Sequence, residues 1–173
     1  MIRGILGAAI AAALAAGCQS VPPDAPKASA HLQPTKGNSV SGHVDFVQLG
    51  DKVRVTAHIE GLKPGSEVGF HIHEAGDCSS GDGMSAKGHF NPYGKPHAHA
   101  GTPERHAGDL PSLKADASGK AMLTTELDVI SVAPGPASVV GRGLIVHAQP
   151  DDFKTQPTGN AGARSACAVI QKG

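Results

Sequence analysis

Apolar and polar residues alternate in short runs along most of this chain. In the segments 41–49 and 52–62, one face carries apolar residues: Val44, Phe46, Val53, Val55, Ala57 and Ile59. Alternation with a period of two predicts β-strands with one face in a core and the other in solvent. Gly50 and Asp51 lie between the two segments and predict a hairpin turn. The two segments are therefore expected to pair.

Further short strands are predicted at 68–74, on both sides of Ser118-Gly119 within 113–129, and at 141–148. Aromatic residues make up only 3% of the chain, whereas there are 23 Gly and 13 Pro. This composition disfavours a helical bundle and suits short strands joined by turns. The sequence thus predicts an all-β sandwich or barrel with two long irregular loops, at roughly 75–110 and 150–165. Loops of this length usually carry function.

The first residues predict an export signal. Arg3 is followed by an apolar run over 5–16 and by small residues before Cys18, and the run is too short to span a membrane. The letters LAAGC resemble a bacterial lipobox, in which Cys18 becomes lipidated; ordinary cleavage near Ala15 or Ala16 is the alternative. Residues 18–36, rich in Pro, Ala and Ser, are expected to form a flexible tether. Residues 37–173 would then form one folded domain.

Charge and cysteine content narrow the class of protein. The chain has 15 Lys and Arg against 15 Asp and Glu, a balance that gives no support for nucleic-acid binding. Cys78 and Cys167 are an even pair, which suits one disulfide in an oxidising compartment; two buried free thiols are the alternative. Closing an 89-residue loop would stabilise the fold by about 4–5 kcal/mol.

Two groups of histidines indicate metal binding. Within 70–73, alternation sends Phe70 and Ile72 to one side and His71 and His73 to the other, where two imidazoles can share one metal. His147, at the end of a predicted strand, could reach the same surface, although a structural role is the alternative.

The second group lies in the segment 87–110, where His89, His97, His106 and Asp109 are spaced eight, nine and three residues apart. Three imidazoles and one carboxylate form a closed tetrahedral set that suits Zn²⁺, whereas an all-imidazole set accommodates redox-active copper. A solvated polar loop or a metal-scavenging tract are the alternatives. A scavenging tract tends to be repetitive, and this segment is irregular.

Five motifs, GFHIHE, GHFNP, ERHAGDL, GRGLIVH and GNAGARSAC, occur in this order between residues 69 and 167. In order and spacing they resemble the motifs of the copper,zinc superoxide dismutases in their bacterial, exported form, over about 39–170. The resemblance implies a Greek-key β-barrel or flattened sandwich, the architecture known for that family. It also implies dismutation of superoxide to oxygen and hydrogen peroxide, with copper and zinc as cofactors.

The same resemblance implies a role for each matching residue. His89 would bridge both metals, and its eight-residue spacing favours His97 over His99 as a zinc ligand. Copper would be held by His71, His73, His89 and His147, and zinc by His89, His97, His106 and Asp109. Asp151 would hydrogen-bond a copper ligand and a zinc ligand, Arg164 would attract the anionic substrate, Thr158 would narrow the channel, and Cys78 and Cys167 would form the disulfide.

An alternative function is a non-catalytic lipoprotein on the same fold that binds copper or zinc in the cell envelope. The presence of all four copper-type histidines together with Arg164 favours the enzyme. The expected location is the periplasm or cell envelope, with possible membrane anchoring through a lipid on Cys18. The sequence leaves open whether the protein is a monomer or a homodimer.

Overall fold

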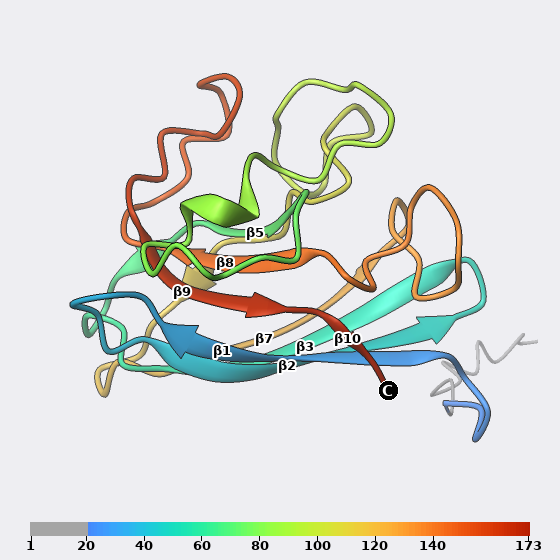
Figure 1. Cartoon of the computed structure of the whole chain (residues 1–173), viewed down its shortest axis with the longest axis horizontal. Helices are drawn as coiled ribbons and strands as arrows, with labels where there is room; N and C mark the ends of the chain where they lie inside the picture. Colours follow the sequence, from blue (N-terminus) through green and yellow to red (C-terminus); the bar gives the residue numbers. More distant parts are fainter. Residues whose placement is uncertain (1–20) are drawn as a thin grey trace, which may run out of the picture.

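The computed structural model describes residues 21–173, which form an all-β protein (Figure 1). No α-helix occurs in this part of the chain, so no helix within it is long and apolar enough to cross a membrane. The predicted export signal and Cys18 lie outside the described residues. The elements are β1 (Lys27–Pro34), β2 (Ser41–Leu49), β3 (Lys52–Glu60), β4 (Glu67–Val68), β5 (Phe70–His73), the 3-10 helix η1 (Met84–Ala86), β6 (Leu113–Lys114), β7 (Ala121–Leu127), β8 (Gly143–His147), β9 (Arg164–Val169) and β10 (Gln171–Lys172).

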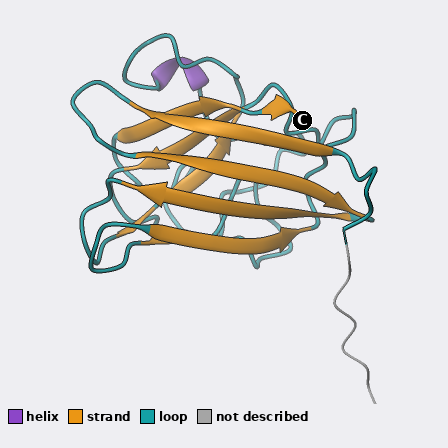
Figure 2. Cartoon of the chain, turned by 90° about the horizontal axis from the view of Figure 1, so that it is seen from below, coloured by secondary structure: helices purple, strands orange, loops and turns teal. Residues whose placement is uncertain are grey.

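The strands form one curled antiparallel sheet in the order β5-β8-β9-β1-β2-β3-β7, with β10 also pairing with β1. The curl places β5, β8 and β9 over the layer of β1, β2, β3 and β7, with the core between (Figure 1). Figure 2 looks onto the lower layer from below. A short β4–β6 ladder joins the segments that lead into the two edge strands, β5 and β7. The predicted all-β fold is confirmed.

The hairpin of β2 and β3 follows the predicted pattern. Leu49 pairs with Lys52 across the turn, where Gly50 has a φ of 59°, a left-handed conformation that glycine adopts without strain. The inward-facing residues Val44, Phe46, Val53, Val55, Ala57 and Ile59 are all buried. Periodicity was sufficient here because one face of each strand lies in the core and the other in solvent.

Strand β1 lies inside the segment 18–36 that was predicted to be a flexible tether, so that prediction is wrong for residues 27–34. Ala28, Ala30 and Leu32 alternate inward and are buried, and β1 pairs with β2 over six residues, from Lys27–Val47 to Leu32–Gly42. The alternation was missed because alanine gives a weak hydrophobic signal and prolines flank the run. The strand is stabilised by its neighbours β2 and β9 rather than by its own composition.

The two long loops occur where they were expected. One connects β5 to β6 and contains only η1, and the other connects β8 to β9 without a strand. Both rise on the same side of the molecule, above β5 and β8 (Figure 1). All the predicted metal ligands belong to these loops or to the strands β5 and β8 beneath them.

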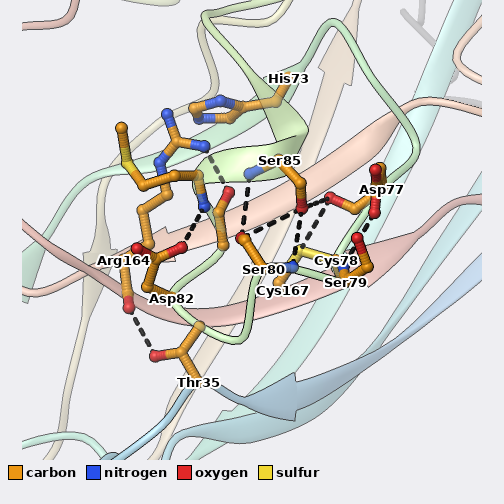
Figure 3. Close-up of a disulfide and its surroundings, with 12 residues drawn as sticks. Thr35, His73, Asp77, Cys78, Ser79, Ser80, Asp82, Ser85, Arg164 and Cys167 are labelled. Atoms are coloured by element: carbon orange, nitrogen blue, oxygen red, sulfur yellow. Dashed lines mark hydrogen bonds between the residues drawn. A yellow bond between two sulfur atoms is a disulfide. The ribbon is translucent and has the colours of Figure 1, made fainter.

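A disulfide joins Cys78, in the first long loop, to Cys167 on β9 (Figure 3). Cys167 is buried with Ala86 of η1 and Ile145 of β8, and Cys78 packs against this small cluster. The bond therefore fixes the start of the loop to the sheet that carries the site.

Reduction of this disulfide in the metal-free protein should lower the melting temperature. Closing a loop of this length stabilises the folded state by about 4–5 kcal/mol, so its loss should lower the melting temperature of a chain of this size by roughly 8–20 °C. Calorimetry with and without reductant measures the shift. The Cys78→Ala/Cys167→Ala variant is the control, and it should melt like the reduced protein and not respond to reductant. An unchanged melting temperature would mean that the bond does not stabilise the fold.

Candidate metal centre

The first long loop folds back along β5 and so brings its ligands to the strand. Ile72 donates a backbone hydrogen bond to Gly108 O and accepts one from Phe90 N, each at 2.9 Å. Consequently His73 lies opposite His89, and His71 lies opposite Asp109. A Cβ atom on Gly108 would lie 2.1 Å from Ile72 O, so only glycine permits this approach.

Four imidazoles meet where this loop, β5 and β8 converge. His71, His73, His89 and His147 are buried, and one ligand atom from each lies within 4.8 Å of those of the other three. Each ring has one buried nitrogen without a hydrogen-bond partner: Nδ1 of His71 and Nε2 of His73, His89 and His147. A buried polar atom without a partner costs about 1–3 kcal/mol. Four such atoms at one point fit a metal ion that accepts their lone pairs.

The second nitrogen of each ring has a partner that fixes the orientation of the ring. His73 Nδ1 donates to Lys87 O at 2.8 Å, and His147 Nδ1 donates to Gly162 O at 3.2 Å. His71 Nε2 lies 2.7 Å from Asp151 Oδ2. Metal-binding histidines are typically held in this way by carbonyls or carboxylates. When the nitrogen that makes this contact carries the proton, the other ring nitrogen, which points into the group, keeps a free lone pair.

The second group contains His89, His97, His106 and Asp109, which are also buried and within 4.8 Å of one another. Asp109 Oδ1 lies 2.9 Å from Nδ1 of His89, 2.9 Å from Nδ1 of His97 and 3.4 Å from Nδ1 of His106. The Nδ1 atoms of His89 and His106 are 3.3 Å apart. Ligands on a tetrahedral zinc ion lie about 3.3–3.4 Å from one another. The spacing of this group therefore suits Zn²⁺.

Asp109 is held for this role by the loop itself. Its Oδ2 accepts hydrogen bonds from the backbone N–H groups of Ala98 and His106, both at 3.0 Å, so Oδ1 is directed at the three imidazoles. His89 is common to both groups. Its Nδ1 faces this second group, and its Nε2 faces the first group, called the all-imidazole group below (His71, His73, His89 and His147). His99 is exposed, with its ring against Phe153, whereas His97 is the histidine that lies in the second group.

Asp151 links the two groups from the second long loop. Its Oδ2 contacts His71 Nε2, and its Oδ1 lies 2.9 Å from His97 Nε2 and accepts a bond from Phe153 N at 2.7 Å. Gly159 lies directly against this contact, because a Cβ atom there would be 1.8 Å from Asp151 Oδ1. The contribution of Gly159 was missed from the sequence, as were those of Gly108 and the Lys87 carbonyl, since nothing in the local pattern marks them.

Arg164 begins β9, and its guanidinium extends toward the His73 ring (Figure 3). Two of its nitrogens donate to Gly83 O and Lys87 O, and its backbone carbonyl accepts a 2.6 Å bond from Thr35. The Lys87 carbonyl thus accepts from both Arg164 and His73. Thr158 is half-buried in the second long loop, next to Gly159, and its place in a channel stays a prediction.

Burial lowers the pKa values of three histidines in the all-imidazole group. It lowers the pKa of His89 to about 4 and that of His147 to about 3, with neighbouring histidines adding to the effect, and it holds the pKa of His73 well below 6.5. In His97, burial also lowers the pKa, but hydrogen bonds to Asp109 and Asp151 outweigh it and raise the pKa to about 9. His73, His89 and His147 are consequently neutral at pH 7, as metal ligands must be.

These features together define a class of protein: a curled antiparallel β-sheet whose two long loops build adjacent metal sites joined by one imidazole. Residues 40–170 match the model of the copper/zinc superoxide dismutase family. The chain belongs to this family.

Individual relatives agree with this assignment. Superoxide dismutase [Cu-Zn] 2 of Aquifex aeolicus (strain VF5) is 38% identical over 149 residues, which cover 84% of this chain and 86% of the relative. Superoxide dismutase [Cu-Zn] of Paramecium bursaria Chlorella virus 1 is 42% identical over 137 residues, covering 76% and 72%. A crystal structure of the clock protein EA4 superposes with a TM-score of 0.76 at 39% identity, covering 84% of this chain and 93% of that one.

The metal-free protein should lose stability as the pH falls from about 6.5 to about 4. The folded-state pKa values of His73, His89 and His147 lie below 6.5, so in this range the unfolded chain binds protons that the folded chain excludes. Each histidine contributes a slope of about 1.4 kcal/mol per pH unit. Denaturant unfolding at successive pH values measures the slope.

The His147→Ala variant is the control, because it removes one of the three depressed groups and should reduce the slope by about a third. His97 acts in the opposite sense: its raised pKa adds stability that is present below pH 6.5 and lost as the pH rises through about 9. A metal-free protein whose acid-side stability did not change with pH would contradict the assignment of these imidazoles as neutral and buried.

Proposed function

We propose that this protein dismutates superoxide to oxygen and hydrogen peroxide, with one copper and one zinc per chain. The observation that carries the proposal is the position of His89, which presents an unpaired nitrogen to three other imidazoles and its second nitrogen to a tetrahedral group. Membership of the copper/zinc superoxide dismutase family supports it.

The all-imidazole group fits copper. Four imidazoles, each with one buried nitrogen that has no hydrogen-bond partner, form a ligand set that suits this metal: His71, His73, His89 and His147. Bound copper would supply one-electron chemistry, since it can take an electron from one superoxide ion and give one to the next. Hydrogen bonds at the second ring nitrogen, such as that between His71 and Asp151, fix the orientation of the rings.

The second group fits zinc, with His89, His97, His106 and Asp109 at tetrahedral spacing. Zinc has no redox chemistry and would fix the loop. When Nδ1 of His89 is directed into this group, the only position left on that ring for an exchangeable proton is Nε2. Nε2 faces the all-imidazole group, where oxygen chemistry would take place.

Arg164 provides the site for the anion. Two of its N–H groups are used by Gly83 O and Lys87 O, which hold the guanidinium beside His73, and the remaining donors are available to superoxide. A guanidinium keeps its charge at any relevant pH. The reaction consumes two superoxide ions and two protons and yields one oxygen and one hydrogen peroxide. Both protons come from solvent, and His89 Nε2 is placed to relay one of them when its lone pair is not bound to a metal.

A non-catalytic metal-binding protein on the same fold is the alternative. Such a protein needs the ligands but has no need for a fixed cation beside them. The two backbone carbonyls that orient Arg164 toward His73 therefore favour the enzyme.

Metal analysis combined with a superoxide dismutation assay tests the function. The loaded protein should contain one copper and one zinc per chain and remove superoxide. A fully loaded protein without dismutation would leave the metal-binding alternative.

Two variants sharpen this test. His147 belongs only to the all-imidazole group, so His147→Ala should lose copper and activity while it retains zinc. Arg164→Ile should retain both metals but react more slowly, and its rate should depend less on ionic strength, because the attracting charge is gone. Equal rates for Arg164→Ile and the wild type would remove Arg164 from the mechanism.

The proposal extends to location. Residues 1–17 have the pattern of an export signal, Cys18 follows a lipobox-like run, and the disulfide suits an oxidising compartment. We expect the mature protein in the periplasm or cell envelope, anchored by a lipid on Cys18, as a monomer or homodimer. Metabolic labelling with a fatty acid should mark the wild type and not Cys18→Ser; labelling of neither would favour ordinary cleavage.

A further inference from the structure

The outer face of the lower layer carries a row of potential ligands outside the site described above. His31 on β1 pairs with His43 on β2, His43 pairs with His58 on β3, and His58 pairs with Met122 on β7. The residues next to them in sequence, such as Leu32, Val44 and Ile59, point into the core, so the four side chains point outward. This row of His31, His43, His58 and Met122 is called the outer row below.

The outer row lies away from the two long loops. The loops rise above β5 and β8, whereas β1, β2, β3 and β7 form the opposite layer (Figures 1 and 2). The row lines a surface groove of about 710 Å³ that also includes Glu60 and Asp116. A ligand can therefore reach it while both metal sites of the proposed function are filled.

The first pair of the row already has the geometry of a chelate. The Nδ1 atoms of His31 and His43 are 3.3 Å apart, the same separation as the Nδ1 atoms of His89 and His106 in the zinc-type group. Ligands about 2 Å from a tetrahedral ion have this spacing. The two rings are tilted by 44° with centroids 4.4 Å apart, so both can direct a nitrogen to one point above the sheet.

A carboxylate orients the central histidine. Asp45, two residues along β2 on the same face, accepts a 2.9 Å bond from His43 Nε2. A proton on Nε2 leaves a lone pair on His43 Nδ1, the atom that faces His31. This carboxylate–histidine arrangement matches the contact of Asp151 with His71 in the buried site, and it is typical of histidines that bind metals.

His58 can complete the set, and Met122 lies one strand beyond it. Side chains directly opposite one another on adjacent strands have Cβ atoms about 4.5–5.5 Å apart, and exposed rings change rotamer freely. His58 is exposed and lies beside His43, so a rotation of its ring brings a third nitrogen toward the pair. Met122 is 77% exposed, which is unusual for a large apolar side chain, and its thioether lies next in the row.

We propose that the outer row is an accessory copper site that exchanges its ion with solvent. Three imidazoles bind Cu²⁺ in preference to the other divalent first-row ions. Calcium and magnesium ions are not expected at this site, because they bind oxygen donors rather than imidazole nitrogens. The buried metal pair and this site are separate, so each can fill without the other.

Copper titration of the protein already loaded with one copper and one zinc tests the proposal. Equilibrium dialysis against Cu²⁺ should show one additional copper per chain, with a spectroscopic signal of nitrogen ligands. His43→Gln should remove this binding, while the two buried metals and the dismutation rate stay unchanged. The matched control is His99→Gln, which removes another exposed histidine outside the outer row and should leave the additional copper in place.

Two further variants separate a built site from surface histidines in general. Asp45→Asn should weaken the additional binding by about 10–100-fold, because the orientation of His43 is lost. Met122→Leu should leave the additional copper in place, because Met122 lies two strands from His43 and is too far away to share its ion. Additional copper that survives in His43→Gln, that disappears equally in His99→Gln, or that binds at one ion per two chains would overturn the proposal.

Discussion

The imidazole ring of His89 is the constraint on which the rest of the site depends. One nitrogen lies 2.9 Å from Asp109 Oδ1, and the other is buried without a hydrogen-bond partner among three more imidazoles. A ring in this position cannot turn to satisfy one group without leaving the other. The first long loop brings His97, His106 and Asp109 to one edge of this ring, and β5 and β8 bring His71, His73 and His147 to the other.

The folded chain meets that need mainly with backbone contacts. The hydrogen bonds of Ile72 with Gly108 and Phe90 hold the first loop along β5, and the disulfide holds the start of the loop to β9. Side chains then orient the imidazoles: Asp151 hydrogen-bonds to both His71 and His97. The positions of the candidate ligands are therefore held by contacts within the chain.

Much of this could be read from the sequence, although unevenly. Alternation predicted β2 and β3, because their inward residues are strongly apolar, and it predicted that His71 and His73 project together. From the residues alone, His147 was only a candidate; the complete copper set came from the resemblance to the family. β1 was missed because small residues such as Ala28 and Ala30 give almost no periodic signal.

The remaining features could not be predicted because they are contacts between distant backbone atoms. Gly108 and Gly159 are required by the close approach of Ile72 O and Asp151, and neither approach leaves a mark in the sequence around the glycine. The row of His31, His43 and His58 likewise depends on strand register, which local patterns do not define.

The backbone carbonyl oxygen of Lys87 determines which changes at position 87 would disturb the site. It accepts hydrogen bonds from both the His73 ring and the Arg164 guanidinium, and so it connects the proposed copper ligand to the proposed substrate-attracting cation. The Lys87 side chain takes no part in this; it extends into solvent, 3.9 Å from Glu74. Exchange of Lys87 for another unbranched polar residue that keeps its φ of 63° would change the surface charge and leave this oxygen in place. Displacement of the peptide itself, by contrast, would disturb electron transfer and anion capture together, even though every functional side chain was intact.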